Sequence, residues 1–235
     1  MKNYINLQSN LNMALANYNK REDNMNKKLI SQVFALIIII ISLIIMIGLI
    51  FQIPILLLAI SGYITIKFIT ALCFFLIGLM LFLISKKLSN FSELVVPMCS
   101  FLVLLLMFTL LLSFLIGIKL GIEDLFIKES PGAVQTLFPG LPSMFTMIAF
   151  ILIAPAGFVV IFDYENKNNK FLWLAIFVTF IGSLAFLGYL IQKPLLYYTL
   201  MFSNPMALIT AVLFIFAGIS LILLREKEQN KEGRK

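Results

Sequence analysis

Residues 70–78 read TALCFFLIG, an apolar stretch in which Thr70, Phe74 and Gly78 follow one another at intervals of four. The same spacing of a threonine, a phenylalanine and a small residue occurs twice more, at Thr146, Phe150 and Ala154 and at Thr210, Phe214 and Gly218. Residues at i, i+4 and i+8 lie close to one stripe of an α-helix, because each step of four overshoots a full turn by about 40°. Each copy therefore predicts a helix with a hydroxyl, a ring and a gap along one face, and small residues let helices approach closely in membranes. Ordinary helix packing explains any single copy, whereas three copies indicate a unit that is used three times.

The composition places these helices in a membrane. The 235 residues are 61% hydrophobic and 12% charged, whereas soluble domains are about half apolar and a quarter charged. A run of about 20 apolar residues is needed to cross the hydrocarbon. The sequence supplies six such runs, at residues 29–51, 66–85, 95–118, 143–162, 171–191 and 205–224. We therefore expect an all-α integral membrane protein with six transmembrane helices, in which the apolar residues 54–66 are re-entrant, interfacial or part of the second span.

A second motif recurs at the ends of the first and fifth runs. Glycine, glutamine, proline and leucine stand at the same offsets in residues 48–56 and 188–196. The distance from this glycine to the next threonine of the stripe is 22 residues in both copies, from Gly48 to Thr70 and from Gly188 to Thr210. The middle copy is looser. The repeated unit is thus a helix, an outer loop and a second helix, and its three copies span about residues 29–85, 95–162 and 171–224.

The distribution of Lys and Arg predicts the topology. Fourteen of the 18 lie in residues 1–28, after the second and fourth runs and in residues 225–235, and the other four are Lys67, Lys119, Lys128 and Lys193. Cytoplasmic segments of membrane proteins are enriched in Lys and Arg. We therefore expect a polar cytoplasmic segment at 1–28, a six-helix domain at 29–224 and a charged cytoplasmic tail at 225–235. Topology and anionic lipids explain the basic surplus, so we expect no nucleic-acid partner.

Residues 1–28 carry apolar side chains at a three–four spacing, at Tyr4, Leu7, Leu11, Ala14 and Tyr18. This spacing fits a short amphipathic helix on the membrane surface or a weak pairing helix. The many asparagines favour a frayed segment about equally, because asparagine is a poor helix former.

The sequence shows no constellation of residues that predicts catalysis. Histidine is absent, and no run carries an acidic residue near its centre, where proton relays and ion sites of membrane proteins place one. Cys73 and Cys99 have no metal-like spacing and are interpreted as small packing residues. Glu123 and Asp124 form a lone acidic pair in the long outer loop; they are candidate contacts for a cation or a substrate, beside the ordinary interpretation as a solvated loop face. We expect no enzyme activity, no metal site and no cofactor.

Neutral polar residues near the outer ends of the runs form the candidate binding site: Gln52, Thr70, Thr146, Gln192 and Thr210. If the three hairpins pack around a pseudo-threefold axis, these residues converge on a small pocket, whose floor one turn deeper is made by Phe74, Phe150 and Phe214. Unpaired amides and hydroxyls are costly in hydrocarbon. They therefore pair with one another, with backbone carbonyls or with a ligand, and pairing within the bundle is the structural alternative to a ligand pocket.

Three segments resemble a known family. The run KLGIEDLF at 119–126, the run PGLPSM at 139–144 and the Thr146–Phe150 pair that follows are similar to the membrane-embedded input region of bacterial sensor histidine kinases and diguanylate cyclases. Residues 70–78 and 204–214 look like further copies of the same signature. The likeness covers most of residues 29–224, but Leu141 stands where the family usually has arginine, and Ala154 replaces a glycine.

The resemblance implies a multi-pass sensor module in the cytoplasmic membrane of a bacterium. No PAS, kinase or cyclase domain follows the last run in this sequence, so we expect any such activity to lie in another chain or domain. The expected partners are membrane lipids and a cytoplasmic signalling protein or a second copy of the chain, and the ligand is not identified. A small permease or an accessory subunit of a transport or assembly complex is the alternative function.

Overall fold

The computed structural model of the protein describes residues 2–53, 66–86, 89–118, 121–122, 140–161, 167–197 and 204–224. Its helices are α1 (Lys2–Ile50), α3 (Phe68–Ser85), α4 (Asn90–Ile116), α5 (Met144–Ile153), α6 (Pro155–Ile161), α7 (Lys167–Leu190), the short 3₁₀ helix η1 (Pro194–Leu196) and α8 (Leu208–Leu224). No strand occurs among the residues described. The all-α prediction is therefore confirmed.

Within the described part of the chain, five helical segments are long and apolar enough to cross a membrane: Leu11–Ile50, Phe68–Ser85, Asn90–Ile116, Met144–Ile161 and Leu172–Leu190. The helix α8 is equally apolar but has 17 residues, which is about 26 Å at 1.5 Å per residue, against a hydrocarbon core of about 30 Å. The sixth apolar run is thus shorter as a helix than expected, because residues 204–207 precede α8 without helical structure. These helices are those of a multi-pass membrane protein.

The first and fourth runs differ from their predicted bounds. Instead of a short or frayed segment before a span, α1 is one continuous helix of 49 residues. The fourth run is divided at Ala154, where α5 ends and Pro155 begins α6. Proline lacks the N–H that would continue the helical ladder. The Ser100 hydroxyl of α4 donates a 2.7 Å hydrogen bond to the Ala154 carbonyl at this break.

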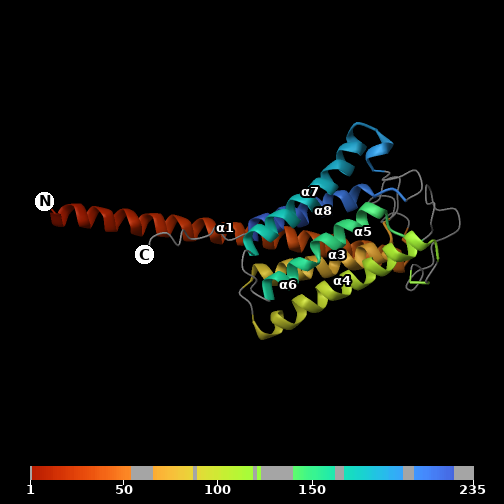
Figure 1. The fold of residues 1–235 in the computed structure, drawn as a ribbon, viewed down its shortest axis with the longest axis horizontal. Helices are drawn as coiled ribbons and strands as arrows, with labels where there is room; N and C mark the ends of the chain where they lie inside the picture. The colour runs from red at the N-terminus through yellow and green to blue at the C-terminus, as the bar shows by residue number, and fades with distance from the viewer. Residues whose placement is uncertain are drawn as a thin grey trace.

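The helices pack side by side in one bundle (Figure 1), in which α3, α5 and α8 form the inner set and α1, α4 and α7 the outer set. The inner helices α3, α5 and α8 contact one another. Each outer helix contacts two inner ones: α1 contacts α3 and α8, α4 contacts α3 and α5, and α7 contacts α5 and α8. Burial follows the same division, since 56% of α3 and 50% of α5–α6 are buried, against 28–33% of the spans in α1, α4 and α7.

Glycines of the inner helices bring the outer helices close. A methyl group added to Gly78 of α3 would lie 3.2 Å from the Ala35 carbonyl oxygen of α1. A methyl group added to Gly218 of α8 would lie 3.0 Å from the Ala175 carbonyl oxygen of α7 and would overlap the Thr179 hydroxyl. The third position of the threonine stripe therefore sets the contact between inner and outer helix, as its small size predicts.

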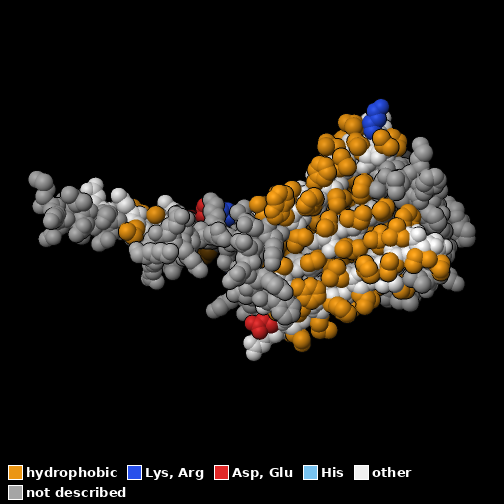
Figure 2. Space-filling view, in the orientation of Figure 1, with side chains coloured by type: hydrophobic (Ala, Val, Ile, Leu, Met, Phe, Trp, Pro, Cys, Tyr) orange, Lys and Arg blue, Asp and Glu red, His pale blue; other side chains and the backbone are white. Residues whose placement is uncertain are grey.

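The outer surface of the bundle is apolar. Figure 2 shows hydrophobic side chains over nearly all of the described bundle face. Phenylalanines of the outer helices are among the exposed residues, including Phe101 and Phe108 of α4 and Phe177 and Phe180 of α7. A continuous apolar surface of this extent is unusual on a soluble monomer, and it is the surface that lipid chains cover in a membrane protein.

Candidate functional site

The phenylalanines of the three stripes meet in the centre of the bundle. The ring centroids of Phe74, Phe150 and Phe214 are separated by 4.7, 4.8 and 4.8 Å, and the rings are inclined to one another by 56–63°. All three side chains are completely buried. Tilted and edge-to-face pairs at this distance each add about 0.5–1.5 kcal/mol beyond the burial of their surface. The three rings therefore pack α3, α5 and α8 against one another, with nearly equal distances between the ring centroids.

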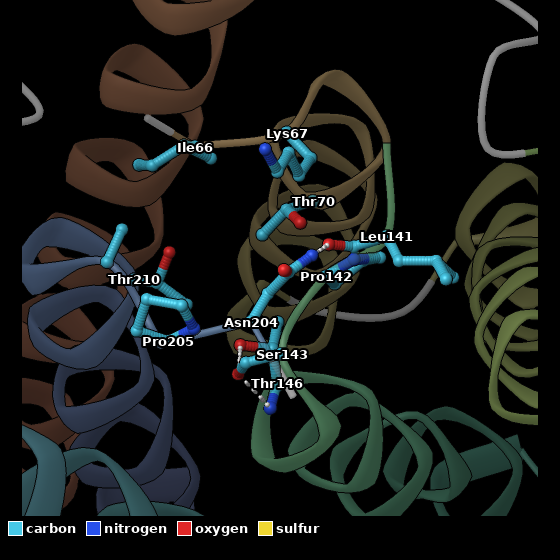
Figure 3. Close-up of a pocket in the computed structure, with 11 residues that line it drawn as sticks. Ile66, Lys67, Thr70, Leu141, Pro142, Ser143, Thr146, Asn204, Pro205 and Thr210 are labelled. Carbon is cyan, nitrogen blue, oxygen red and sulfur yellow. Dashed lines mark hydrogen bonds between the residues drawn. The ribbon is translucent and has the colours of Figure 1, made fainter. Parts of the chain in front are cut away.

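The three threonines of the stripes line one cavity, at the end of the bundle where the inner helices begin (Figure 3). The residues around it come from the first turns of α3, α5 and α8 and from the segments just before them: Ile66, Lys67, Thr70, Leu141, Pro142, Ser143, Thr146, Asn204, Pro205, Ala207 and Thr210. The cavity measures about 20 Å³, which is enough for a water molecule. The structure thus brings together the hydroxyls that the spacing predicts to converge.

Two sets of hydrogen bonds hold one side of the cavity. The Ser143 hydroxyl caps α5, since it accepts a 3.1 Å hydrogen bond from the Thr146 amide, and the two hydroxyl oxygens are 2.7 Å apart. The Asn204 side chain donates a 2.6 Å hydrogen bond to the Leu141 carbonyl (Figure 3). This bond ties the segment before α8 to the segment before α5, and Asn204 is buried.

The hydroxyls of Thr70 and Thr210 differ from that of Thr146. Their side chains are 3% and 2% exposed, and within the described part of the chain neither hydroxyl has a hydrogen-bond partner. A buried polar group without a partner costs about 1–3 kcal/mol. These two hydroxyls are therefore the groups in the cavity that gain most from a water molecule or a ligand.

The cavity is rich in donors and positive in character. The N-termini of α3, α5 and α8 face it, and a helix N-terminus carries a partial positive charge and unpaired amides. Lys67 adds a full charge at the start of α3, and none of the described residues that line the cavity is acidic. This environment favours a negatively charged or strongly accepting group.

The structure does not bring Gln52 and Gln192 to the cavity. Both residues are exposed at the ends of α1 and α7, and both have a left-handed backbone, with φ of 49° and 52°. The amide after each glutamine bonds back to the recurring glycine, from Ile53 to Gly48 at 3.0 Å and from Lys193 to Gly188 at 2.9 Å. This is the Schellman pattern of a helix end, so the second recurring motif ends α1 and α7.

Several lining residues were not predicted from the sequence, above all Lys67, Ser143 and Asn204. Two of them, Lys67 and Ser143, can be found from their distance to the threonine of the stripe. Each threonine is the third residue of its helix, so the residue three before it is the N-cap: Lys67, Ser143 and Ala207. The candidate loop contacts Glu123 and Asp124 lie outside the described residues.

Comparison of the chain with protein-family models, with curated proteins and with solved structures finds no match. The function is therefore argued from this geometry.

Proposed function

We propose that the protein is a sensor module of a bacterial cytoplasmic membrane, built from three helix hairpins that cross the membrane six times, without catalytic activity of its own. The observation that carries this proposal is the cavity at which all three inner helices begin. A ligand there touches every hairpin at once. It can therefore favour one arrangement of the hairpins over another, which is what a sensor requires.

Burial supports the three-hairpin organisation. Equivalent positions of the first and third hairpins lie 140 residues apart in the chain and are both buried. Ala35 corresponds in this way to Ala175, and Ile38 corresponds to Val178. The middle hairpin of α4 with α5–α6 places Ser100 against the small residue Ala154. Each hairpin is then one outer and one inner helix, with the inner helix carrying the stripe.

The direction of the helices supports a cytoplasmic location for both termini. Figure 1 shows the N-terminal half of α1 leaving the bundle at the end opposite to the starts of α3, α5 and α8. The end of α8 lies on that same side. With the Lys- and Arg-rich segments in the cytoplasm, the cavity faces the outside or the outer leaflet.

The long helix α1 and the inner helix α8 are suited to carry a signal across the membrane. They are joined by a buried hydrogen bond in which the Ser31 and Ser220 hydroxyl oxygens are 2.7 Å apart. This contact lies near the end of α8, on the side away from the cavity. A shift of α8 at the cavity would change the Ser31–Ser220 contact, and α1 extends beyond the bundle from there.

The phenylalanine cluster argues for a sensor over a permease. Phe74, Phe150 and Phe214 fill the bundle axis one turn beyond the threonines and are completely buried. A transport path along this axis would have to separate all three rings. A binding site that ends at the cavity needs no such movement.

Disulfide crosslinking in living cells tests the proposal. Ser31→Cys with Ser220→Cys, in a chain in which Cys73 and Cys99 are alanine, reports on the contact between α1 and α8. Gln32→Cys with Ser85→Cys is the control within one hairpin, where the Gln32 amide reaches the Ser85 carbonyl at 3.5 Å. We expect the crosslinking yield of the first pair to change with external pH, osmolarity or lipid supply, and to become constant when Thr70 and Thr210 are valine. A yield that follows the control pair under every condition would overturn the sensor proposal.

A further inference from the structure

We propose that the cavity binds an oxyanion, a carboxylate or phosphate group, through the hydroxyls of Thr70 and Thr210 and the first turns of α3 and α8. This inference names the ligand class of the proposed sensory site and rests on that proposal for its biological meaning.

The starts of α3 and α8 lack the side-chain cap that the start of α5 has. At α5, the Ser143 hydroxyl accepts the amide of the third helical residue, Thr146. At α3 the equivalent residue is Lys67, which makes no side-chain cap. At α8 it is Ala207, whose side chain has no polar atom. The third-residue amides of α3 and α8 are therefore left for an acceptor that the described residues do not supply.

Two buried hydroxyls lie beside these amides. Thr70 and Thr210 stand at the third position of their helices, 3% and 2% exposed, and each offers a hydroxyl donor beside the uncapped amide. Figure 3 shows their side chains approaching the same space from two different helices. A single oxygen atom between them would accept hydrogen bonds from both helices. Charged acceptors form the stronger bonds of this kind.

Charge also bears on the kind of ligand. Among the described residues that line the cavity, Lys67 carries the one charged side chain. The Leu141 carbonyl, an acceptor at the cavity, is already bonded by Asn204. The described lining therefore favours an anion over a cation. Helix N-termini bind anions in soluble and membrane proteins for the same reason.

The size of the cavity limits which part of a ligand can enter it. A space of about 20 Å³ admits about one oxygen atom, so the anion is held by its end while the rest of the molecule stays outside the cavity. A free carboxylate or phosphate from outside the cell fits this description, and so does the head group of a lipid in the outer leaflet. The shared chemistry is the terminal oxyanion.

Thermal unfolding of the full chain in an uncharged detergent tests the inference. The buried cysteines Cys73 and Cys99 react with a thiol-specific fluorophore when the chain unfolds, so they report the unfolding temperature without an engineered cysteine. Sodium acetate and sodium phosphate are compared with sodium chloride at constant pH and ionic strength. In a second arm, mixed micelles contain either phosphatidic acid or the neutral lipid monoolein.

We expect an oxyanion to raise the unfolding temperature by at least about 3 °C at saturation, because ligands that bind only the folded state stabilise it. The shift should disappear in Thr70→Val with Thr210→Val, which removes both hydroxyls and keeps the shape. It should persist in Thr109→Val, since the Thr109 hydroxyl bonds its own helix at the Leu105 carbonyl. Thr70→Ser with Thr210→Ser keeps both donors and should keep the shift. This variant still tests the inference if the double valine variant does not fold.

The two arms separate the sources of the anion. A shift with acetate or phosphate indicates a soluble ligand, whereas a shift with phosphatidic acid alone indicates a lipid head group. The absence of any shift, or an equal shift in the double valine variant, would overturn the inference. Failure of the sensor proposal is a distinct result, because an anion could stabilise the chain while the Ser31–Ser220 crosslinking yield stays constant.

Discussion

The rings of Phe74 and Phe214 lie 4.8 Å apart, centroid to centroid, although 140 residues separate them in the chain. Each ring is completely buried and also contacts Phe150 of the middle stripe. Contacts between helices α3 and α8 are therefore made by equivalent residues of two copies of one motif. The cluster fixes how far apart the threonines can lie one turn away.

Replacement of a ring in this cluster should destabilise the protein strongly. We expect Phe74→Ala to lower the free energy of unfolding by about 3–5 kcal/mol, as a large cavity at a buried site does. Phe74→Ala with Phe214→Ala should cost less than the sum of the single changes, because the two rings contact each other. The control is Phe180→Ala on α7, where the ring is exposed and the cost should be small. Thermal unfolding in detergent measures all four chains, and an equal cost at Phe180 would contradict the role of the cluster.

A methyl group at Gly78 should push α3 away from α1. Such a group would lie 2.8 Å from a side-chain carbon of Ile39 and 3.2 Å from the Ala35 carbonyl oxygen. We expect Gly78→Ala to destabilise the protein by about 1–3 kcal/mol, the usual cost of overfilling a packed site. The flexible Ile39 side chain is the nearer neighbour, so Ile39→Ala should restore part of the stability of Gly78→Ala. If Ile39→Ala instead adds its own full cost to that of Gly78→Ala, then the two residues do not meet as described.

A serine at the start of α8 should supply the helix cap that Ala207 cannot form. Ala207 occupies the position that Ser143 holds before α5, so Ala207→Ser offers the Thr210 amide the acceptor that Thr146 already has. We expect this change to raise the free energy of unfolding by about 1 kcal/mol, and Ser143→Ala to lower it by a similar amount. Ala207→Ser should also weaken the stabilisation by acetate or phosphate, because the Thr210 amide then donates its hydrogen bond to the serine hydroxyl. Unfolding temperatures with and without anion give both quantities, and an undiminished anion response in Ala207→Ser would count against the amide as a ligand.

The sequence predicts the inner helices well because their pattern has a direct physical meaning. A stripe of Thr, Phe and a small residue at intervals of four marks one helical face, and identical faces pack in one centre, as Phe74, Phe150 and Phe214 do. The break at Ala154 could not be placed in this way. The apolar run continues through Pro155, and the bond from Ser100 that supports the break comes from 54 residues earlier in the chain.

The candidate site could be predicted only in part, for a similar reason. The threonines follow from the stripe, but the segments that precede α5 and α8 are placed by a contact between Asn204 and Leu141, which no local pattern indicates. The length of the N-terminal helix could not be predicted either. The three–four spacing favours a short helix and the asparagines favour a frayed segment, whereas α1 runs without a break from Lys2 to Ile50.

Substitution of Gln192 distinguishes a role in ending the helix from a role in binding a ligand. Gln52 and Gln192 have the same backbone conformation. Both have a positive φ, which costs a residue with a side chain about 1 kcal/mol and costs glycine almost nothing. We therefore expect Gln192→Gly to raise the free energy of unfolding slightly or leave it unchanged, and Gln192→Val to lower it, because a β-branched residue tolerates this backbone least. Neither change should alter the rise in unfolding temperature with acetate or phosphate, since Gln192 does not line the cavity. If Gln192→Gly abolishes the rise in unfolding temperature with anion and leaves the stability of the chain unchanged, then Gln192 contributes to binding. That result would contradict its assignment as a helix end alone.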